Sequence, residues 1–353
     1  MRGMFKDKSK GLVNEFVIDS DYNQCNGYGD TSRNFTNAIS KLMPIKIMAP
    51  RHYHSYLGSI GYGDKIIKNT PTVLSALTIQ PTFSLMRPPV ALKNAVFTMF
   101  ESSRLRPEWV QRINTFGLCL TPSTHCVAEF QDQLKIPVTH TYQGYDHDLY
   151  KFHQKKTTDP FVFGAAGHVG HGKARKGIHR IIDWFLAAFP NQKDVRLKVK
   201  INAFKDNDLS ISDPRISVIE KDIPEIGCRD WLRSLDCYVD GSTCEGWGMW
   251  TQNAMATGNA VICTNYSARN DYLYFRNHIP MGYRRVPASL EYLGMGHWSM
   301  PDRSDAIEAM RWAYNNPAEC KEIGRNAYES VKHMTWEASA KLILKAMRKH
   351  SLL

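Results

Sequence analysis

The stretch from Cys237 to Cys263 contains the residues with the clearest chemical potential in this 353-residue chain. Glu245 and the glycines Gly246 and Gly248 follow a short apolar run, and a helix-forming segment then ends near Gly258. A helix that begins at a glycine-rich corner presents free backbone N–H groups and the positive end of its dipole, which suit a phosphate group. A carboxylate beside that corner can accept hydrogen bonds from sugar hydroxyls. The pattern therefore predicts a nucleotide-sugar site.

A second glycine-rich segment, residues 163–177, combines small residues with several cations. A GxxxxGK pattern that starts at Gly167 is similar to most of a phosphate-binding P-loop, but Ala174 stands where such a loop has the Ser or Thr that binds magnesium. We therefore expect a cationic loop rather than an NTPase, with Lys176 neutralising a diphosphate. His168, Lys173 and Arg175 are weaker candidates for the same role, because they could equally be solvated loop residues.

A glycine corner near the N-terminus contains Gly27 and Gly29 and precedes a helical segment at residues 31–42. Glycine after a first strand allows the backbone to approach a ligand closely, although an ordinary strand–helix turn would use the same residues. The preceding Asp19-Ser20-Asp21 is similar to the paired-aspartate motif of metal-dependent sugar transferases. Acids after a strand are also common loop formers, and we expect no metal site.

The chain is strongly basic, with a net charge of +11. Residues 40–112 have ten Lys or Arg against three acids, and they include RHYHSY, in which basic and aromatic residues alternate. Such a surface could bind a polyanion and stack on bases, or it could be a solvated face or attract anionic lipid heads. The acceptor-binding candidates from this region are Arg51, His52, Tyr53, His54 and Arg104.

Size and composition indicate a globular protein with room for two domains. Apolar residues make up 43% of the chain, yet no apolar run is long enough to span a membrane. The first residues lack the apolar core of a signal peptide, and the eight cysteines are scattered without a CxxC pair. We therefore expect a cytoplasmic protein, in the host cytoplasm if a phage encodes it. The sequence does not determine the oligomeric state.

Short apolar runs alternate with helical patterns along the chain, which predicts an α/β fold with parallel sheets. The polar segment Tyr150–Pro160 is the best candidate for a domain boundary. We predict two Rossmann-like, doubly wound domains facing a cleft, an acceptor-binding domain at 1–155 and a nucleotide-sugar-binding domain at 156–335. A last helix, capped by Thr335, falls in 336–353 and is expected to pack back towards the N-terminal domain. The predicted strands are Glu15–Ile18, Ile45–Met48, Val96–Phe100, Leu118–Thr121, Val138–Thr141, Phe161–Phe163, Arg196–Lys200, Ser217–Glu220, Cys237–Val239 and Ala260–Cys263.

Several dispersed motifs resemble the retaining GT-B glycosyltransferases of the family 4 type (glycosyl transferases group 1), which include sucrose synthases and bacterial mannosyltransferases. EGWGMWTQNAMATGNAVI, which begins at Glu245, is similar to the family's EGFGLPxLEAMAxGxPVI. FTMFESSRLRPEWVQRIN, LTPS and QGYDHDLYKF follow the order of the family's acceptor-domain segments, and TWEASAKLIL is similar to its closing helix. The resemblance covers nearly the whole chain.

The resemblance implies a role for each matching position. Glu245 would hold the hydroxyls of the donor sugar, and Lys176 would balance the leaving diphosphate. Glu101 would lie where acceptor and donor sugar meet, although a structural cap explains that residue nearly as well. The other donor-binding positions are Gly27, Gly29, His168, Lys173, Arg175, Gly246, Gly248, Met249, Trp250 and Asn253.

Two positions depart from the family pattern. The family's second acid, which holds the ribose diol, is Asn253 here, and a neutral amide binds hydroxyls differently from a carboxylate. The arginine of the family's donor loop also has no counterpart, because the expected spacing falls on Gly170. His168, Lys173 or Arg175 could replace it.

The resulting hypothesis is a retaining, metal-independent hexosyl- or pentosyltransferase without a bound cofactor. Its donor would be a nucleotide-diphosphate sugar, and we expect a UDP-sugar. The favoured acceptor is a hydroxymethylated pyrimidine base in DNA, such as hydroxymethylcytosine, as in bacteriophage DNA modification. The alternatives are transfer to lipopolysaccharide, a lipid-linked or another glycan, and a non-catalytic module that binds nucleotide-sugar or DNA.

Overall fold

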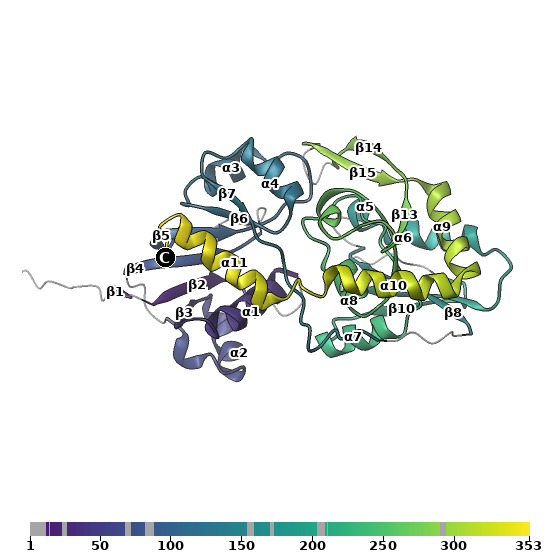
Figure 1. The fold of residues 1–353 in the computed structure, drawn as a ribbon, viewed down its shortest axis with the longest axis horizontal. Helices are drawn as coiled ribbons and strands as arrows, with labels where there is room; N and C mark the ends of the chain where they lie inside the picture. Colours follow the sequence, from purple (N-terminus) through teal and green to yellow (C-terminus); the bar gives the residue numbers. More distant parts are fainter. Residues whose placement is uncertain are drawn as a thin grey trace, which may run out of the picture.

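The computed structural model describes residues 12–13, 15–22, 27–67, 72–81, 88–153, 159–169, 173–202, 209, 211–289 and 294–353. Within these ranges the chain forms two parallel sheets with helices packed around them, side by side along the long axis of the molecule (Figure 1). Parallel neighbours need a crossover connection, and the alternation of strand and helix supplies it. The predicted α/β class with two doubly wound, Rossmann-like domains is confirmed.

In the N-terminal sheet the order in which strands are added reverses at β2. Its strands are β1 (Leu12–Val13), β2 (Phe16–Ser20), β3 (Ile45–Met48), β4 (Thr72–Ile79), β5 (Ala91–Phe97), β6 (Cys119–Thr121) and β7 (Val138–His140). Their order is β3-β2-β4-β5-β6-β7, with β1 also paired to β4. The surrounding helices are α1 (Gly27–Ser40), η1 (Arg51–Tyr53), α2 (His54–Ser59), η2 (Gly63–Lys65), α3 (Pro107–Ile113) and α4 (Thr124–Gln131). Because β2 lies between β3 and β4, the loop from β2 into α1 starts at the point where the strand order reverses, a usual place for ligands.

The C-terminal sheet has the strand order of a dinucleotide-binding fold. Its strands are β8 (Phe161–Gly167), β9 (Val195–Ile201), β10 (Ile216–Glu220), β11 (Cys237–Val239), β12 (Ala260–Thr264) and β13 (Ile279–Met281), in the order β10-β9-β8-β11-β12-β13. The helices between them are α5 (Lys173–Lys176), α6 (Ile178–Ala188), α7 (Glu225–Arg233), α8 (Met249–Ala256) and η3 (Ser267–Asp271). The order reverses between β8 and β11, so the loops after these two strands frame the expected ligand site.

The chain ends by returning to the first sheet. An antiparallel hairpin, β14 (Tyr283–Pro287) and β15 (His297–Pro301), precedes α9 (Arg303–Asn315) and α10 (Pro317–Val331). The last helix, α11 (Trp336–Lys349), crosses to the N-terminal half and packs on α1 (Figure 1). Thr335 accepts a hydrogen bond from the Ala338 N–H at 3.2 Å, which confirms the predicted cap. The two crossing segments are themselves paired, because Tyr145 N donates to Met334 O at 3.0 Å.

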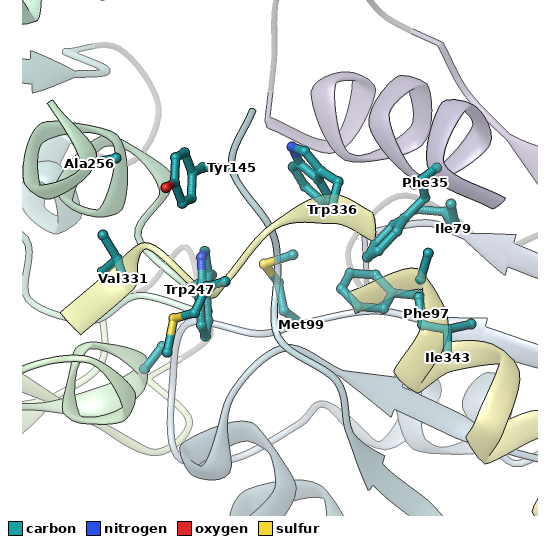
Figure 2. Packing of buried hydrophobic residues seen from close by; sticks show 14 of the residues in the cluster. Phe35, Ile79, Phe97, Met99, Tyr145, Trp247, Ala256, Val331, Trp336 and Ile343 are labelled. Atoms are coloured by element: carbon teal, nitrogen blue, oxygen red, sulfur yellow. The ribbon is translucent and has the colours of Figure 1, made fainter. Parts of the chain in front are cut away.

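One buried cluster continues from the N-terminal sheet into the C-terminal one. Figure 2 shows Trp336 at the start of α11 beside Phe35, which also packs on Phe97 from β5. The ring centroids of Phe35 lie 4.9 Å from Trp336 and 5.0 Å from Phe97, both in edge-to-face geometry. Trp247, at 1% exposure, belongs to the same cluster on the other side of the junction. Aromatic burial of this kind is a strong stabilising contribution, so the two sheets share part of their core.

The predicted strands were mostly found within a few residues of their expected positions, with two kinds of error. The boundaries of Val96–Phe100 were wrong, because β5 runs from Ala91 to Phe97 and leaves Glu101 four residues past its end. The prediction also lacked β1, β4, β13 and the β14–β15 hairpin. None of the helices in the described ranges is both long and apolar enough to cross a membrane.

Candidate functional site

The turn that follows β11 is held by a buried ion pair. Arg269 Nη1 lies 2.8 Å from Asp240 Oδ2, and the Arg269 side chain is 0% exposed. Asp240 also accepts hydrogen bonds from Thr251 Oγ1 at 2.8 Å and Ser242 N at 2.9 Å. Burial alone would raise the pKa of Asp240, but Arg269 and the Ser242 hydrogen bonds outweigh it and hold that pKa well below its usual value. The turn is therefore a fixed support for the residues that follow it.

Glu245, at the end of this turn, is contacted by two cationic side chains from the segment that follows β8. Lys176 Nζ lies 2.7 Å and Arg175 Nη1 lies 3.2 Å from the same oxygen, Glu245 Oε1. Glu245 is 5% exposed. Burial would raise the pKa of this carboxyl, but Lys176 and Arg175 together keep it below its ordinary value. The Glu245 carboxyl therefore stays ionised at neutral pH, and the three side chains form a compact cluster between β8 and β11.

Hydrogen bonds to the backbone also hold Arg175 in place, in addition to its ion pair with Glu245. Its Nη1 also donates to Cys244 O at 3.1 Å, and its own carbonyl accepts from Thr243 N at 2.8 Å. Its Nη2 lies 3.9 Å from Oε1 of Glu101, which follows β5 in the N-terminal half. Arg175, one of the three candidates for the missing loop arginine, is thus placed in direct contact with Glu245 and next to Lys176.

The helix after Glu245 starts at Gly248, whose backbone conformation favours glycine. Gly248 has φ +94 and precedes Met249, the first residue of α8, a conformation that other residues adopt only with strain. The N-terminus of α8 faces the N-terminus of α1, since a methyl group placed on Gly27 would lie 3.4 Å from Met249 Sδ. The structure thus brings the predicted N-terminal glycine corner opposite the EGWGM segment. Gly29, also predicted, is buried in the first turn of α1.

The N-terminal half closes on the site through residues 99–103. A methyl group on Gly246 would lie 2.7 Å from Met99 Cγ, so only glycine allows this approach. Trp298 of β15 donates from Nε1 to Glu101 O at 2.7 Å. Ser102 Oγ donates to Met295 O at 2.7 Å, and His297 N donates to Ser103 Oγ at 2.8 Å. Glu101 is therefore held at the junction by the hairpin, which the sequence did not predict.

The remaining donor candidates lie around this cluster in different settings. Burial, with Lys176 and Arg175 nearby, lowers the pKa of His168 to about 4, so its imidazole is neutral at pH 7. Trp250 packs edge-on against Trp231 at 5.7 Å, and Asn253 lies one turn later on α8. Lys173 begins α5, but its side chain lies outside the described part of the chain, as do residues 170–172.

The structure separates the predicted acceptor residues into two places. Arg51, His52 and Tyr53 form η1 and His54 starts α2, all directly after β3 at one edge of the sheet. Arg104 follows β5, and the strands β2 and β4 lie between β3 and β5, a separation of roughly 14 Å at about 4.8 Å per strand. Arg51, His52 and Arg104 are exposed. Of this set, only Arg104 adjoins Glu101 along the chain.

Two charged residues near the site were not selected from the sequence. Lys200, at the end of β9, has its Nζ 5.7 Å from the ring centroid of Trp250. Asp30, in the first turn of α1, is an electrostatic partner of Lys200 from the opposite sheet. Their positions in the sequence could have identified them, because Lys200 is the last residue of the predicted strand Arg196–Lys200 and Asp30 directly follows the glycine corner.

The assembled groups can bind an anionic, hydroxyl-bearing ligand. Two fixed cations and the N-terminus of α8 can neutralise phosphate oxygens, while Glu245 can accept hydrogen bonds from hydroxyls. Within the described ranges, no group of three or more His, Cys, Asp or Glu side chains is arranged to hold a metal ion.

Comparison with known proteins relates this arrangement to sugar-transferring enzymes through the fold. No protein-family model and no curated protein matches the sequence. Sucrose-phosphate synthase from Thermosynechococcus elongatus superposes with a TM-score of 0.67 at 12% identity, over 95% of this chain and 98% of that one. HepE from Anabaena, solved with UDP and glucose, gives 0.64 at 12% identity, over 95% and 100%. WaaG, a glycosyltransferase involved in lipopolysaccharide biosynthesis, gives 0.61 at 11% identity, over 94% and 99%.

These solved structures share the whole two-sheet arrangement with this chain, since the matches extend over nearly the full length of both partners. The strand orders, the strand-order reversal between β8 and β11 and the returning C-terminal helix agree with that likeness. The chain therefore has the GT-B fold of two Rossmann-like domains that is found in glycosyltransferases.

Proposed function

We propose that the protein is a retaining, metal-independent glycosyltransferase that moves a sugar from a nucleotide-diphosphate sugar, with UDP as the expected carrier, to an acceptor hydroxyl. The observation that carries the proposal is the cluster of Lys176 and Arg175 on Glu245, buried between β8 and β11. It combines a diphosphate-neutralising pair with a hydroxyl acceptor at the place where α/β folds bind nucleotides. HepE, which has the same fold, was solved with UDP and glucose.

In this proposal Lys176 and Arg175 exchange one anionic partner, Glu245, for another, the diphosphate of the donor. Without donor, Lys176 and Arg175 neutralise Glu245. A bound diphosphate offers them more negative charge, which leaves Glu245 to accept hydrogen bonds from the sugar hydroxyls. As the bond between sugar and diphosphate breaks, negative charge grows on the leaving oxygen, and prepositioned cations stabilise that charge most. The acceptor hydroxyl attacks from the same face, and its proton passes to a phosphate oxygen, so the sugar keeps its anomeric configuration.

Glu101 marks the acceptor side of the reaction centre in this scheme. Its carbonyl is fixed by Trp298 and its carboxylate lies 3.9 Å from Arg175. An acceptor that enters beside Glu101 would meet the donor sugar between that residue and Glu245.

The acceptor that we favour is a hydroxymethylated pyrimidine base in DNA. The support is the basic surface of the N-terminal domain, in which Arg51, His52 and Arg104 are exposed. A lipopolysaccharide or other glycan acceptor is the alternative, and the likeness to WaaG favours it. Binding to DNA that contains 5-hydroxymethylcytosine should weaken at least tenfold between 50 and 200 mM salt, because phosphate contacts release counterions. An affinity that does not change with salt would favour the glycan.

The activity itself is tested by release of free nucleotide from UDP-glucose, UDP-N-acetylglucosamine and GDP-mannose with candidate acceptors. Glu245→Ala should lower turnover about 100-fold or more, in the range seen when a transition-state contact is lost. Glu308→Ala removes an exposed acid from α9 and should have no effect. Equal turnover of the Glu245 variant and the wild type would overturn the assignment, and absence of turnover with every donor would leave the non-catalytic alternative.

A further inference from the structure

Lys200 is a buried cation that forms no close ion pair within the described part of the chain. It is 5% exposed, although lysine is rarely so enclosed unless it is paired. No carboxylate in the described part of the chain lies within ion-pair distance of its Nζ, whose recorded neighbour is the face of Trp250 at 5.7 Å. Lys200 is the penultimate residue of β9, at the carboxyl edge of the sheet where α/β folds bind their ligands. A buried ammonium in this position is suited to an anionic ligand.

Asp30 approaches the same place from the other sheet. It lies in the first turn of α1, and the start of that helix faces Met249 at the start of α8. Its Oδ1 is bonded to Arg33, whereas its Oδ2 makes no hydrogen bond with any described residue. The Asp30 side chain keeps 28% of its surface exposed, so a ligand can reach part of it.

The two residues extend the charged cluster in one direction. The charges of Lys176, Arg175 and Lys200 all act on His168, and Lys200 in turn acts on Asp30. Because Lys200 covers Trp250 of α8 and α1 begins opposite the start of that helix, we infer a line that runs from Glu245, where the sugar is proposed to bind, past the diphosphate cations to Lys200 and Asp30. Asn253, one helical turn after Trp250, lies on the same face of α8 as the ring that Lys200 covers. A nucleotide-sugar laid along this line would place its ribose near Asp30.

We propose that Lys200 and Asp30 form the nucleoside end of the donor site, a role that rests on the proposed function. Lys200 donates a hydrogen bond to the phosphate attached to the ribose, and Asp30 accepts hydrogen bonds from the ribose hydroxyls. Asn253 offers a neutral amide where a carboxylate would serve for the diol, and Asp30 supplies that carboxylate from the opposite domain. Because Lys200 and Asp30 belong to different halves of the molecule, the site can bind the ribose through both residues only when the two halves are in contact.

The test is calorimetric binding of UDP and GDP, each beside its 2′-deoxy form, to the full chain. Wild type should bind the ribose form at least tenfold more tightly, and Asp30→Ala should abolish that preference. Lys200→Met should weaken both sugar forms about tenfold and keep the preference. Lys198→Met, on the same strand but bonded to Ser234, and Asp132→Ala, an exposed acid of the N-terminal half, are the matched controls and should behave as wild type.

The outcomes separate this inference from the proposed function. If wild type prefers ribose and Asp30→Ala prefers it equally, the role of Asp30 is overturned while the nucleotide site stands. If Lys200→Met binds UDP and GDP like wild type, the role of Lys200 is overturned. If wild type binds none of the four nucleotides, the proposed function fails and this inference fails with it. A melting curve of each variant identifies loss of binding that is caused by loss of folding.

Discussion

Arg175 and Glu101 meet across the junction of the two sheets, with Arg175 Nη2 3.9 Å from Glu101 Oε1. The same guanidinium bonds Glu245 on its own sheet, so it links the candidate donor side to the candidate acceptor side. Neither domain alone contains this arrangement. The chemistry proposed here therefore depends on how firmly residues 99–103 are held against the second domain.

Arg175 should be the functional replacement for the missing loop arginine. Arg175→Ala should lower turnover about 100-fold, and Arg175→Lys about tenfold, because lysine keeps the charge but loses the planar fork. Steady-state nucleotide release measures both, with Arg348→Ala, on the exposed face of α11, as the control. Wild-type turnover by Arg175→Ala would direct attention to His168 or Lys173.

The Asp240–Arg269 pair should be essential for stability. Arg269→Met leaves a buried carboxylate without its partner, and the free energy of unfolding should fall by about 3–5 kcal/mol. Adding Asp240→Asn removes the buried charge and should recover part of that loss. Urea unfolding of the single and double variants measures both effects. A single variant within 1 kcal/mol of wild type, on the order of a surface substitution, would contradict the prediction.

Gly246 should be sensitive to a single methyl group. Gly246→Ala forces a carbon to within 2.7 Å of Met99 Cγ, so we expect a loss of about 1–3 kcal/mol from overpacking. Met99→Ala removes the obstacle, and the double variant should be more stable than the sum of the two single losses predicts. Additive losses in a double-mutant cycle would show that the contact is not the cause.

Stability should depend on pH through Asp30. Burial, helped by the nearby Glu225, raises the pKa of Asp30 to about 7 against the opposing effects of Arg33 and Lys200. The folded state therefore keeps a proton that the unfolded chain loses near pH 4, so stability falls as pH rises through this window, and the loss is complete above pH 7. Asp30→Asn should gain on the order of 1–3 kcal/mol at pH 8 and almost nothing at pH 4.

Thermal melts of wild type and Asp30→Asn between pH 4 and 8 measure that difference, with Asp132→Asn as the exposed control. A gain that is equal at all pH values would exclude titration as its cause. Together with weaker nucleotide binding, a stability gain would identify Asp30 as a residue kept for function at a cost in stability.

The fold was largely readable from the sequence because local pattern and topology agree in most segments. Central strand β4 was missed for a physical reason. Its sequence TVLSALTI places Val73, Ala76 and Leu77 at spacings that fit a helix face as well as a strand. Only the pairing with β2 and β5, which is a long-range property, selects the strand.

The site was predictable where a motif is continuous and not where the domains meet. Glu245, Lys176 and Gly27 were selected from local glycine corners, and the structure brings all three to one junction. Lys200 was missed because Arg196, Lys198 and Lys200 alternate along β9, which indicates a solvated face. The last of the three is instead covered by Trp250, a contact between segments 50 residues apart in the chain.

The paired crossing segments have a mechanical consequence. The chain passes between the halves after β7 and again after α10, and the two passages are joined where Tyr145 N bonds Met334 O. Because both passages between the halves are joined at this point, we expect any relative rotation of the halves to occur about an axis through it. Opening about that axis would separate Glu101 from Arg175 and Asp30 from Lys200 in the same movement, coupling entry of the donor to entry of the acceptor.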